Sequence, residues 1–218
     1  DDSTNYQLGL NCFDGLPMPV LNVIGNHDQV HLSDNDLCRL SRNQRLYYSQ
    51  DLGEVHCVVL FSSSVEHTDI TISAEQRLWL QNDLASTDKP TLVFLHHPLD
   101  DQDLIGNVWF EKYPHYCFCE ERLELRQILE ASKRVLAVFG GHVHQNSVSC
   151  INGIYYVTVQ SLVERIERDG GRDTKGGGRD TKDAERESKD AERDAKDAEP
   201  SRAYALVDVL KNEAGEHQ

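Results

Sequence analysis

Residues 139–146 read FGGHVHQN, and this stretch indicates both the fold and the chemistry of the chain. It overlaps the end of an apolar run, residues 134–139 (RVLAVF), which predicts a buried β-strand. The two glycines allow a sharp turn after the strand, because glycine adopts backbone angles that other residues resist. His142 and His144 are then presented on one loop, where neutral imidazoles can bind transition metals. Taken alone, the motif leaves open whether the two histidines form a metal site or are merely solvated.

Two segments earlier in the chain have the same design. Residues 19–24 (PVLNVI) form an apolar run that ends in GNHD at 25–28, and residues 91–95 (TLVFL) end in HHP at 96–98. Ligands of open α/β sheets bind at the carboxyl ends of the strands, so we expect the three histidine-bearing loops to meet. Three independent solvated loops would not be expected to repeat this placement.

The size and charge of the chain limit the class of protein. At 218 residues it suits one domain with a sizeable core. The formal net charge of -15 gives an acidic surface that repels nucleic acid, so we expect no nucleic acid polymer as a partner. No apolar run approaches the roughly 20 residues of a membrane span, so we expect no membrane partner. An anionic small substrate stays compatible, because bound metal cations would dominate the local field.

Six cysteines are scattered along the chain, and we interpret them as reduced thiols rather than disulfides. They are Cys12, Cys38, Cys57, Cys117, Cys119 and Cys150. The cytoplasm is favoured as the compartment but is not assigned, because the true N-terminus is expected to be missing. The sequence gives no indication of the oligomeric state.

Apolar periodicity predicts an alternation of helices and strands, which is typical of an α/β fold. Helices are predicted within 1–16 and over 34–40, 73–84 and 120–132, and strands over 19–24, 46–50, 55–62, 91–95, 134–139, 146–151 and 154–160. The predicted domains are a core at 1–163, a charged low-complexity repeat at 164–202, and a final strand with the C-terminal tail at 203–218. The long irregular segment 99–119 is interpreted either as a substrate-contacting loop or as a packed surface loop.

Together, the three loops make the chain resemble the calcineurin-like metallophosphoesterases. The family pattern runs Asp-x-His, Gly-Asp-x-x-Asp, Gly-Asn-His-(Asp or Glu), a lone His and Gly-His-x-His. The last three motifs occur here in order, at 25–28, at His96 and at 141–144. The segments SAEQRLWLQNDL (73–84) and FLHHP (94–98) are similar to the bacterial branch of cyclic-nucleotide phosphodiesterases.

The resemblance implies two mixed β-sheets packed as a sandwich and flanked by helices, here missing the first strand or strands. It implies two divalent transition metal ions (Mn, Fe or Zn) in the full-length parent, which activate a hydroxide for hydrolysis of phosphate esters. Asn26, His96 and His142 would bind one ion, and His144 would bind the other. His96 is preferred to His97, because family members place the ligand two residues before a proline.

The resemblance also implies catalytic and substrate-contacting residues. His27 would face the substrate phosphate and protonate or stabilise the leaving oxygen, with Asp28 orienting it. His97, Trp109 and His115 are the candidates for contacting the substrate, which we expect to be a small phosphorylated molecule.

The chain departs from the family pattern at its start. It has no Asp-x-His and no complete Gly-Asp-x-x-Asp, and Asp1 lies about where the last aspartate of the second motif is expected. We therefore expect that the sequence was cut within that motif, that it binds at most one metal tightly and that its activity is impaired. The alternatives are a non-catalytic scaffold or binding protein that retains the fold, and a single-metal structural or regulatory site.

Overall fold

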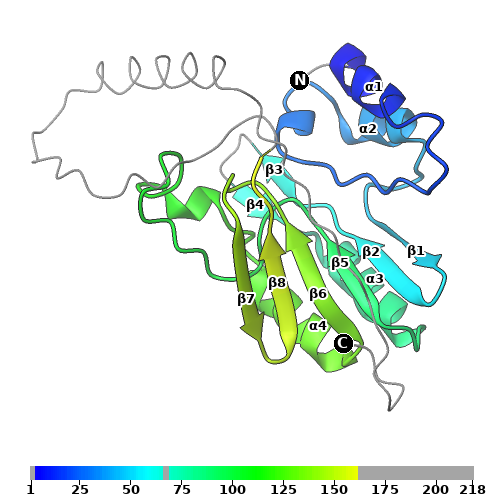
Figure 1. The fold of residues 1–218 in the computed structure, drawn as a ribbon. Coiled ribbons are helices and arrows are strands. Elements are labelled where there is room, and N and C mark those ends of the chain that lie inside the picture. Colours follow the sequence, from blue (N-terminus) through cyan, green and yellow to red (C-terminus); the bar gives the residue numbers. More distant parts are fainter. Residues whose placement is uncertain (1–2, 66–68, 162–218) are drawn as a thin grey trace, which may run out of the picture.

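A computed structural model describes residues 3–65 and 69–161. The centre of this part is a six-stranded sheet in the order β1-β2-β5-β6-β8-β7 (Figure 1). The strands are β1 (Tyr48–Leu52), β2 (Val55–Val59), β5 (Thr91–Phe94), β6 (Val135–Gly140), β7 (Ser147–Ile151) and β8 (Ile154–Thr158). Strands β2, β5, β6 and β8 run parallel, whereas the edge strands β1 and β7 pair antiparallel. The carboxyl ends of the four parallel strands therefore lie at one edge of the sheet.

Apolar runs form the interior strands, because parallel strands are covered on both faces. Four of the five residues of β2 and three of the four residues of β5 are buried. The hairpin between β7 and β8 turns at Asn152 and Gly153, whose φ angles of 52° and 85° suit an Asn-Gly turn. All predicted strands in the described residues are confirmed with slightly shifted ends, except one.

The predicted strand at 19–24 is wrong, because this segment has no regular secondary structure. Pro17 and Pro19 lack the backbone N–H that a strand ladder uses. The hydroxyl of Tyr48 instead bonds both backbone groups of Asn22, accepting from its N–H at 2.8 Å and donating to its carbonyl at 3.1 Å. Side-chain hydrogen bonds thus take the place of a strand partner.

The second sheet is small. Strands β3 (Ser63–Val65) and β4 (Asp69–Thr71) pair antiparallel with each other. The α/β class is confirmed, but the second sheet in the described residues is this antiparallel pair rather than a mixed sheet. Within residues 3–65 and 69–161, these two strands pair with no further strand.

Helices α3 (Ala74–Ala85) and α4 (Arg122–Ser132) cover one face of the main sheet (Figure 1). Ser73 begins α3, because its hydroxyl accepts a hydrogen bond from the N–H of Gln76. Leu80 and Leu129 are fully buried in one core cluster with Val93 of the sheet. Burying each such leucine contributes roughly 1.5–3 kcal/mol.

Two further helices lie near the amino end, α1 (Ser3–Asn11) and α2 (Asp34–Ser41). The four predicted helices are confirmed, although α1 occupies only part of 1–16 and buries none of its residues. Helix α2 begins with a capping box, in which the side chains of Ser33 and Asp36 bond each other's backbone N–H. No helix in the described ranges is long and apolar enough to cross a membrane.

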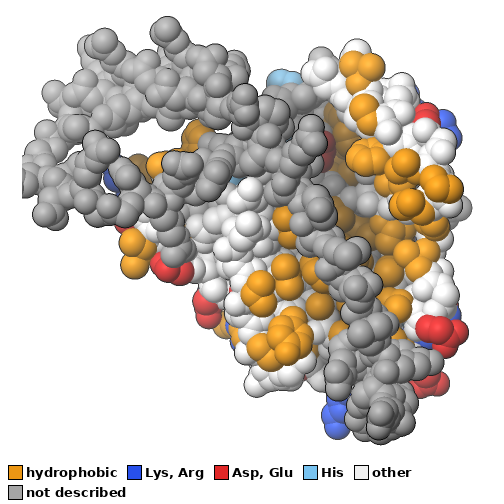
Figure 2. All heavy atoms as spheres, viewed as in Figure 1, with side chains coloured by type: hydrophobic (Ala, Val, Ile, Leu, Met, Phe, Trp, Pro, Cys, Tyr) orange, Lys and Arg blue, Asp and Glu red, His pale blue; other side chains and the backbone are white. Residues whose placement is uncertain are grey.

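The other face of the main sheet carries exposed apolar side chains. Side chains alternate along a strand, so Tyr155 points away from the helix-covered side, on which Tyr156 is buried. Tyr155 is 55% exposed, and Val148 of β7 is 70% exposed. Figure 2 shows apolar side chains over these strands. The described helices therefore bury one face of the sheet only.

The structure bears on the predicted state of the cysteines and on the predicted domains. All six cysteines are free thiols, and Cys57, Cys117 and Cys119 are buried. Most of the predicted core at 1–163 is described, whereas the predicted repeat at 164–202 and the predicted final strand at 203–218 lie outside the described residues.

Candidate metal centre

Side-chain atoms from three separate loops converge at the carboxyl edge of the sheet. Oδ1 of Asn26 lies 2.8 Å from Nε2 of His96, which lies 3.2 Å from Nδ1 of His142. All three side chains are half-buried. An amide oxygen and two imidazole nitrogens are ligands that Mn, Fe and Zn accept, so this donor set fits a transition metal ion. The expectation that the three loops meet is confirmed.

The parallel pairing of β5 and β6 explains why two of these residues are neighbours. Phe94 pairs with Phe139, and their rings stack with centroids 5.2 Å apart. The chain therefore leaves both strands at the same level, and the N–H of Gly141 donates to the carbonyl of His96 at 2.9 Å. His96 and His142 each follow the end of their strand by two positions, which brings their rings together.

The third loop approaches closely because residue 25 is glycine. A Cβ atom on Gly25 would lie 3.0 Å from Cε1 and Nδ1 of the His96 ring. Oδ2 of Asp28 accepts a hydrogen bond from the N–H of Gly25 at 2.8 Å, and this bond closes the 25–28 turn. Glycine and aspartate together set the position of Asn26 against His96.

A backbone carbonyl fixes the tautomer of His142. Nε2 of His142 lies 2.8 Å from the carbonyl oxygen of Tyr116. A carbonyl can only accept, so Nε2 carries the proton and Nδ1 presents its lone pair toward His96. A bond of this kind on the outer nitrogen commonly orients a metal-binding histidine.

His96 and His142 are held in their neutral form. Burial is the main effect that lowers the pKa of His96 to about 3, and nearby His142 and His144 add to it. Burial also lowers the pKa of His142 to about 4, although the bond to the Tyr116 carbonyl opposes this. Both rings are therefore neutral near pH 7, and a neutral ring has a nitrogen lone pair for a metal.

His144 and His27 lie near this cluster. His27 directly follows Asn26 in the chain, and His144 follows His142 by two positions. A charge on either one would lower the pKa of both His96 and His142. His144 is half-buried, whereas His27 is exposed at the start of the short 3-10 helix η1 (His27–Gln29). The structure thus brings the predicted second-metal ligand and the predicted proton donor to one region.

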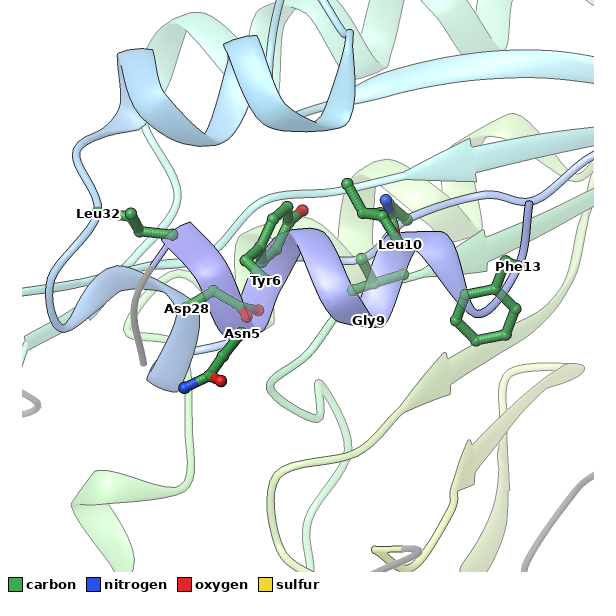
Figure 3. Close-up of a pocket in the computed structure, with 9 residues that line it drawn as sticks. Asn5, Tyr6, Gly9, Leu10, Phe13, Asp28 and Leu32 are labelled. Carbon is green, nitrogen blue, oxygen red and sulfur yellow. The ribbon is translucent and has the colours of Figure 1, made fainter.

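Asp28 faces the amino-terminal helix. It lines a cavity of about 340 Å³ beside α1, where Figure 3 shows it near Asn5 and Tyr6. Burial, with a smaller effect from the Asp28 carboxylate, raises the pKa of Tyr6 to about 12. The contact of Asp28 with Gly25 indicates that it supports the turn carrying His27.

The three candidates for substrate contact occupy different environments. His97 is fully buried, with Nδ1 at 2.7 Å from Oγ of Ser62. Trp109 is half-buried, and His115 is exposed with its ring 4.0 Å from that of Tyr116. His97 also forms a group of potential metal-binding side chains with His96 and His142. One ring nitrogen from each of the three lies within 4.8 Å of the others.

The irregular segment 99–119 contributes contacts that the sequence did not predict. It contains the 3-10 helix η2 (Pro114–Tyr116), and the ring of Phe110 lies 4.8 Å from that of His142. Leu104 and Cys117 pack around fully buried Val143. The segment therefore covers the histidine loop and supplies the Tyr116 carbonyl. An irregular loop has no periodicity, so the sequence held no signal for these contacts.

A family profile described as calcineurin-like phosphoesterase matches residues 2–146, which include all these loops. The chain belongs to this family. It is 30% identical over 151 residues to a probable cyclic nucleotide phosphodiesterase of Fibrobacter succinogenes, covering 67% of this chain and 54% of that protein. It is 25% identical over 167 residues to a glycerophosphodiester phosphodiesterase, GpdQ, of Enterobacter lignolyticus, covering 74% and 58%. The chain spans little more than half the length of these relatives.

A solved structure supports the fold of this family member. A dimetal phosphatase from Danio rerio matches with a TM-score of 0.55 and 16% identity, over 69% of this chain and 63% of that one. Purple acid phosphatase 22 of Arabidopsis thaliana is 36% identical over 104 residues, covering 45% of this chain and 21% of that protein. The metallophosphoesterase fold implied by the family resemblance is confirmed.

Proposed function

We propose that this phosphoesterase-family chain forms the metal-binding part of a hydrolase of small phosphate esters. The observation that carries the proposal is the convergence of Asn26 Oδ1, His96 Nε2 and His142 Nδ1 within 2.8 and 3.2 Å. These residues would hold one divalent transition metal ion (Mn, Fe or Zn), and His144 would contribute to a second. When bound, such ions supply positive charge for the phosphate oxygens and a water of lowered pKa.

The chain's own residues prepare the site. The Tyr116 carbonyl keeps the proton on Nε2 of His142, so Nδ1 is free to bind. Burial keeps His96 neutral, which avoids repulsion between an imidazolium and a cation. The exposed position of His27 suits a side chain that donates a proton to the leaving oxygen of a bound ester. Phosphodiesters are the favoured substrate class, because two relatives are named as phosphodiesterases.

More ligands are assigned to one ion than to the other. Three converging atoms serve the first site, whereas His144 is the one ligand assigned to the second. We therefore propose that this chain holds one equivalent of metal tightly and turns over slowly. Loading with excess Mn²⁺, dialysis against metal-free buffer and elemental analysis test this, since two retained equivalents would contradict it.

The test of catalysis uses a chromogenic phosphodiester with Mn²⁺ at high protein concentration. We compare the wild type with His142→Ala and His27→Ala, and with His31→Ala as a matched control at an exposed position. Loss of turnover in His142→Ala and His27→Ala, with turnover retained in His31→Ala, would support the hydrolase function. A wild type that binds Mn²⁺ but shows no turnover above His142→Ala would favour the scaffold alternative.

A further inference from the structure

The histidine loop has an unusual backbone. His142 has a φ of 67° and His144 a φ of 55°, in the left-handed region that residues other than glycine rarely adopt. Val143 between them is fully buried. Such conformations persist where the surroundings hold them, and they cluster at functional sites. Some contact must therefore hold the Val143 peptide in place.

Asn107 supplies that contact. Its side chain is 1% exposed, and Nδ2 donates to the carbonyl of Val143 at 2.9 Å and to Oε1 of Gln145 at 3.3 Å. Oδ1 accepts from the backbone N–H groups of Trp109 and Phe110, each at 3.1 Å. Two donors and two acceptor positions are thus filled, which is the full capacity of an asparagine amide. Asn107 is held by its own loop and aims its donors at the histidine loop.

We propose that Asn107 is a positioning residue for the metal centre. Its bond to the Val143 carbonyl holds the 143–144 peptide and, with the buried Val143 side chain, keeps His142 and His144 in the left-handed conformation that presents their rings. This inference rests on the proposed function, because presenting the two rings matters when they bind metal. It adds to that function a residue in the irregular segment that touches neither metal nor substrate.

The packing around the loop explains why one hydrogen bond affects the backbone conformation of the histidine loop. The Val143 side chain lies in a cluster with Leu104 and Cys117, so the side chain is anchored. The carbonyl on the same residue is anchored by Asn107. The N–H of Val143 donates to the carbonyl of Gly141 at 2.7 Å, which holds the 142–143 peptide. The bond from Asn107 holds the 143–144 peptide, and without it the plane of that peptide is free to rotate.

The decisive variant is Asn107→Asp. It keeps oxygen acceptors for the N–H groups of Trp109 and Phe110 and removes both donors. Asn146→Asp is the matched control, because the same substitution falls on an exposed amide that bonds Gln160. Asn107→Ser is a second variant with a hydroxyl acceptor for the turn, in case the buried carboxylate prevents folding.

The primary measurement is made without metal. Correlation spectra of the histidine ring nitrogens report the Nε2-protonated tautomer of His142. We expect wild type and Asn146→Asp to give the same His142 signal, and the Asn107 variants to shift or broaden it. The second measurement is Co²⁺ titration followed by visible absorption, in which the Asn107 variants should bind about 10–100-fold more weakly.

The outcomes separate the two proposals. A folded Asn107→Asp or Asn107→Ser protein with a wild-type His142 signal and Co²⁺ affinity would overturn the positioning role, even if its melting temperature falls. A wild type that binds no Co²⁺ would contradict the proposed function, and the His142 spectrum then decides the role of Asn107 alone.

Discussion

Oδ1 of Asn26 lies 2.8 Å from Nε2 of His96, although the two residues are 70 positions apart in the chain. The contact joins a loop without strand structure to the end of a central strand. Because no local interaction demands it, this long-range pair is the best position at which to test the metal centre.

We expect Asn26→Ala to weaken Mn²⁺ binding by at least about tenfold, because the change removes one donor atom and leaves the imidazoles in place. Isothermal titration of the folded protein measures this affinity. Asn146→Ala removes an exposed amide and should bind as the wild type does. Equal affinities for the two variants would show that Asn26 is not a ligand.

Gly25→Ala should disturb the same contact by crowding. The added Cβ would lie 3.0 Å from two atoms of the His96 ring, so the ring or the turn must move. We expect the free energy of unfolding to fall by about 1–3 kcal/mol, as for other overpacked sites, and Mn²⁺ binding to weaken. Gly9→Ala is the control, since its Cβ would meet no atom within 4 Å. Unchanged Mn²⁺ affinity in Gly25→Ala would argue against a close approach.

Ser62→Ala tests the support behind the cluster. Ser62 is fully buried and its hydroxyl bonds Nδ1 of His97, whose Nε2 has no hydrogen-bond partner among the described residues. Removing the hydroxyl leaves a buried ring without a hydrogen bond, which should cost about 1–3 kcal/mol in urea unfolding. Ser86→Ala, at an exposed hydroxyl, should change stability by less than about 0.5 kcal/mol. A similarly small loss of unfolding free energy in both variants would refute a stabilising role of the Ser62–His97 hydrogen bond.

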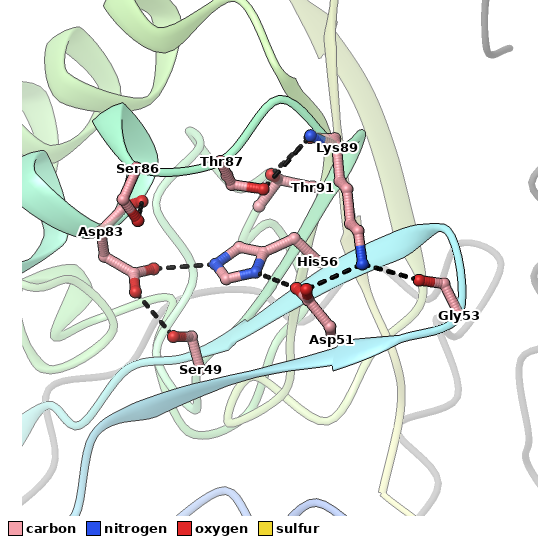
Figure 4. A network of polar contacts seen from close by, with 9 residues as sticks. All are labelled: Ser49, Asp51, Gly53, His56, Asp83, Ser86, Thr87, Lys89 and Thr91. Carbon is pink, nitrogen blue, oxygen red and sulfur yellow. Dashed lines mark hydrogen bonds and ion pairs between the residues drawn. The ribbon is translucent and has the colours of Figure 1, made fainter.

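His56 pairs with Thr91 at the amino end of β5, opposite the carboxyl ends of the strands that carry the metal centre. Its polar contacts predict a pH dependence of stability (Figure 4). Its Nδ1 lies 2.7 Å from Asp51 of β1 and its Nε2 lies 2.9 Å from Asp83 of α3, while Lys89 bonds Asp51 at 2.8 Å. Burial alone would lower the pKa of His56, but the bonds to Asp83 and Asp51 outweigh burial and raise it above 6.5. The folded state therefore binds this proton more tightly than the unfolded state does.

The sign of the effect follows from that difference. The stabilisation from His56 is fully present below its unfolded pKa of about 6.5 and is lost as pH rises through the higher folded value. We expect His56→Gln to be less stable than the wild type at about pH 6, with a gap that shrinks toward about pH 9. Urea unfolding across this range measures the gap, with His31→Gln as an exposed control. A stability difference that stays constant or widens as pH rises would rule out a stabilising interaction of charged His56 with Asp51 and Asp83.

The sheet could be predicted from the sequence because its interior strands are short apolar runs between clear turn signals. The Asn152–Gly153 turn is the plainest case, since both residues adopt the positive φ that the dipeptide suggests. The segment 19–24 misled the prediction because it has the apolar pattern of a strand. Pro19, the preceding Pro17 and the bonds to the Tyr48 hydroxyl remove the need for strand pairing.

The site was predictable in part. The three apolar runs predicted that the loops meet, and the family resemblance singled out Asn26, His96 and His142 on them as ligands. The contacts that orient these residues come from the backbone of Tyr116 and the amide of Asn107. A main-chain carbonyl has no sequence signature, and one asparagine in a loop resembles any other turn residue. The roles of these residues could be found only from coordinates.

Proton placement on His142 depends on a main-chain atom, and this has a consequence for how the protein can vary. No substitution at position 116 deletes that carbonyl, so side chains there can drift without altering which ring nitrogen is protonated. Insertions and deletions act differently, because one residue added between Asn107 and Tyr116 would carry the oxygen away from the ring. Between Asn107 and Tyr116, the chain should therefore tolerate a substitution at position 116 but not an inserted or deleted residue.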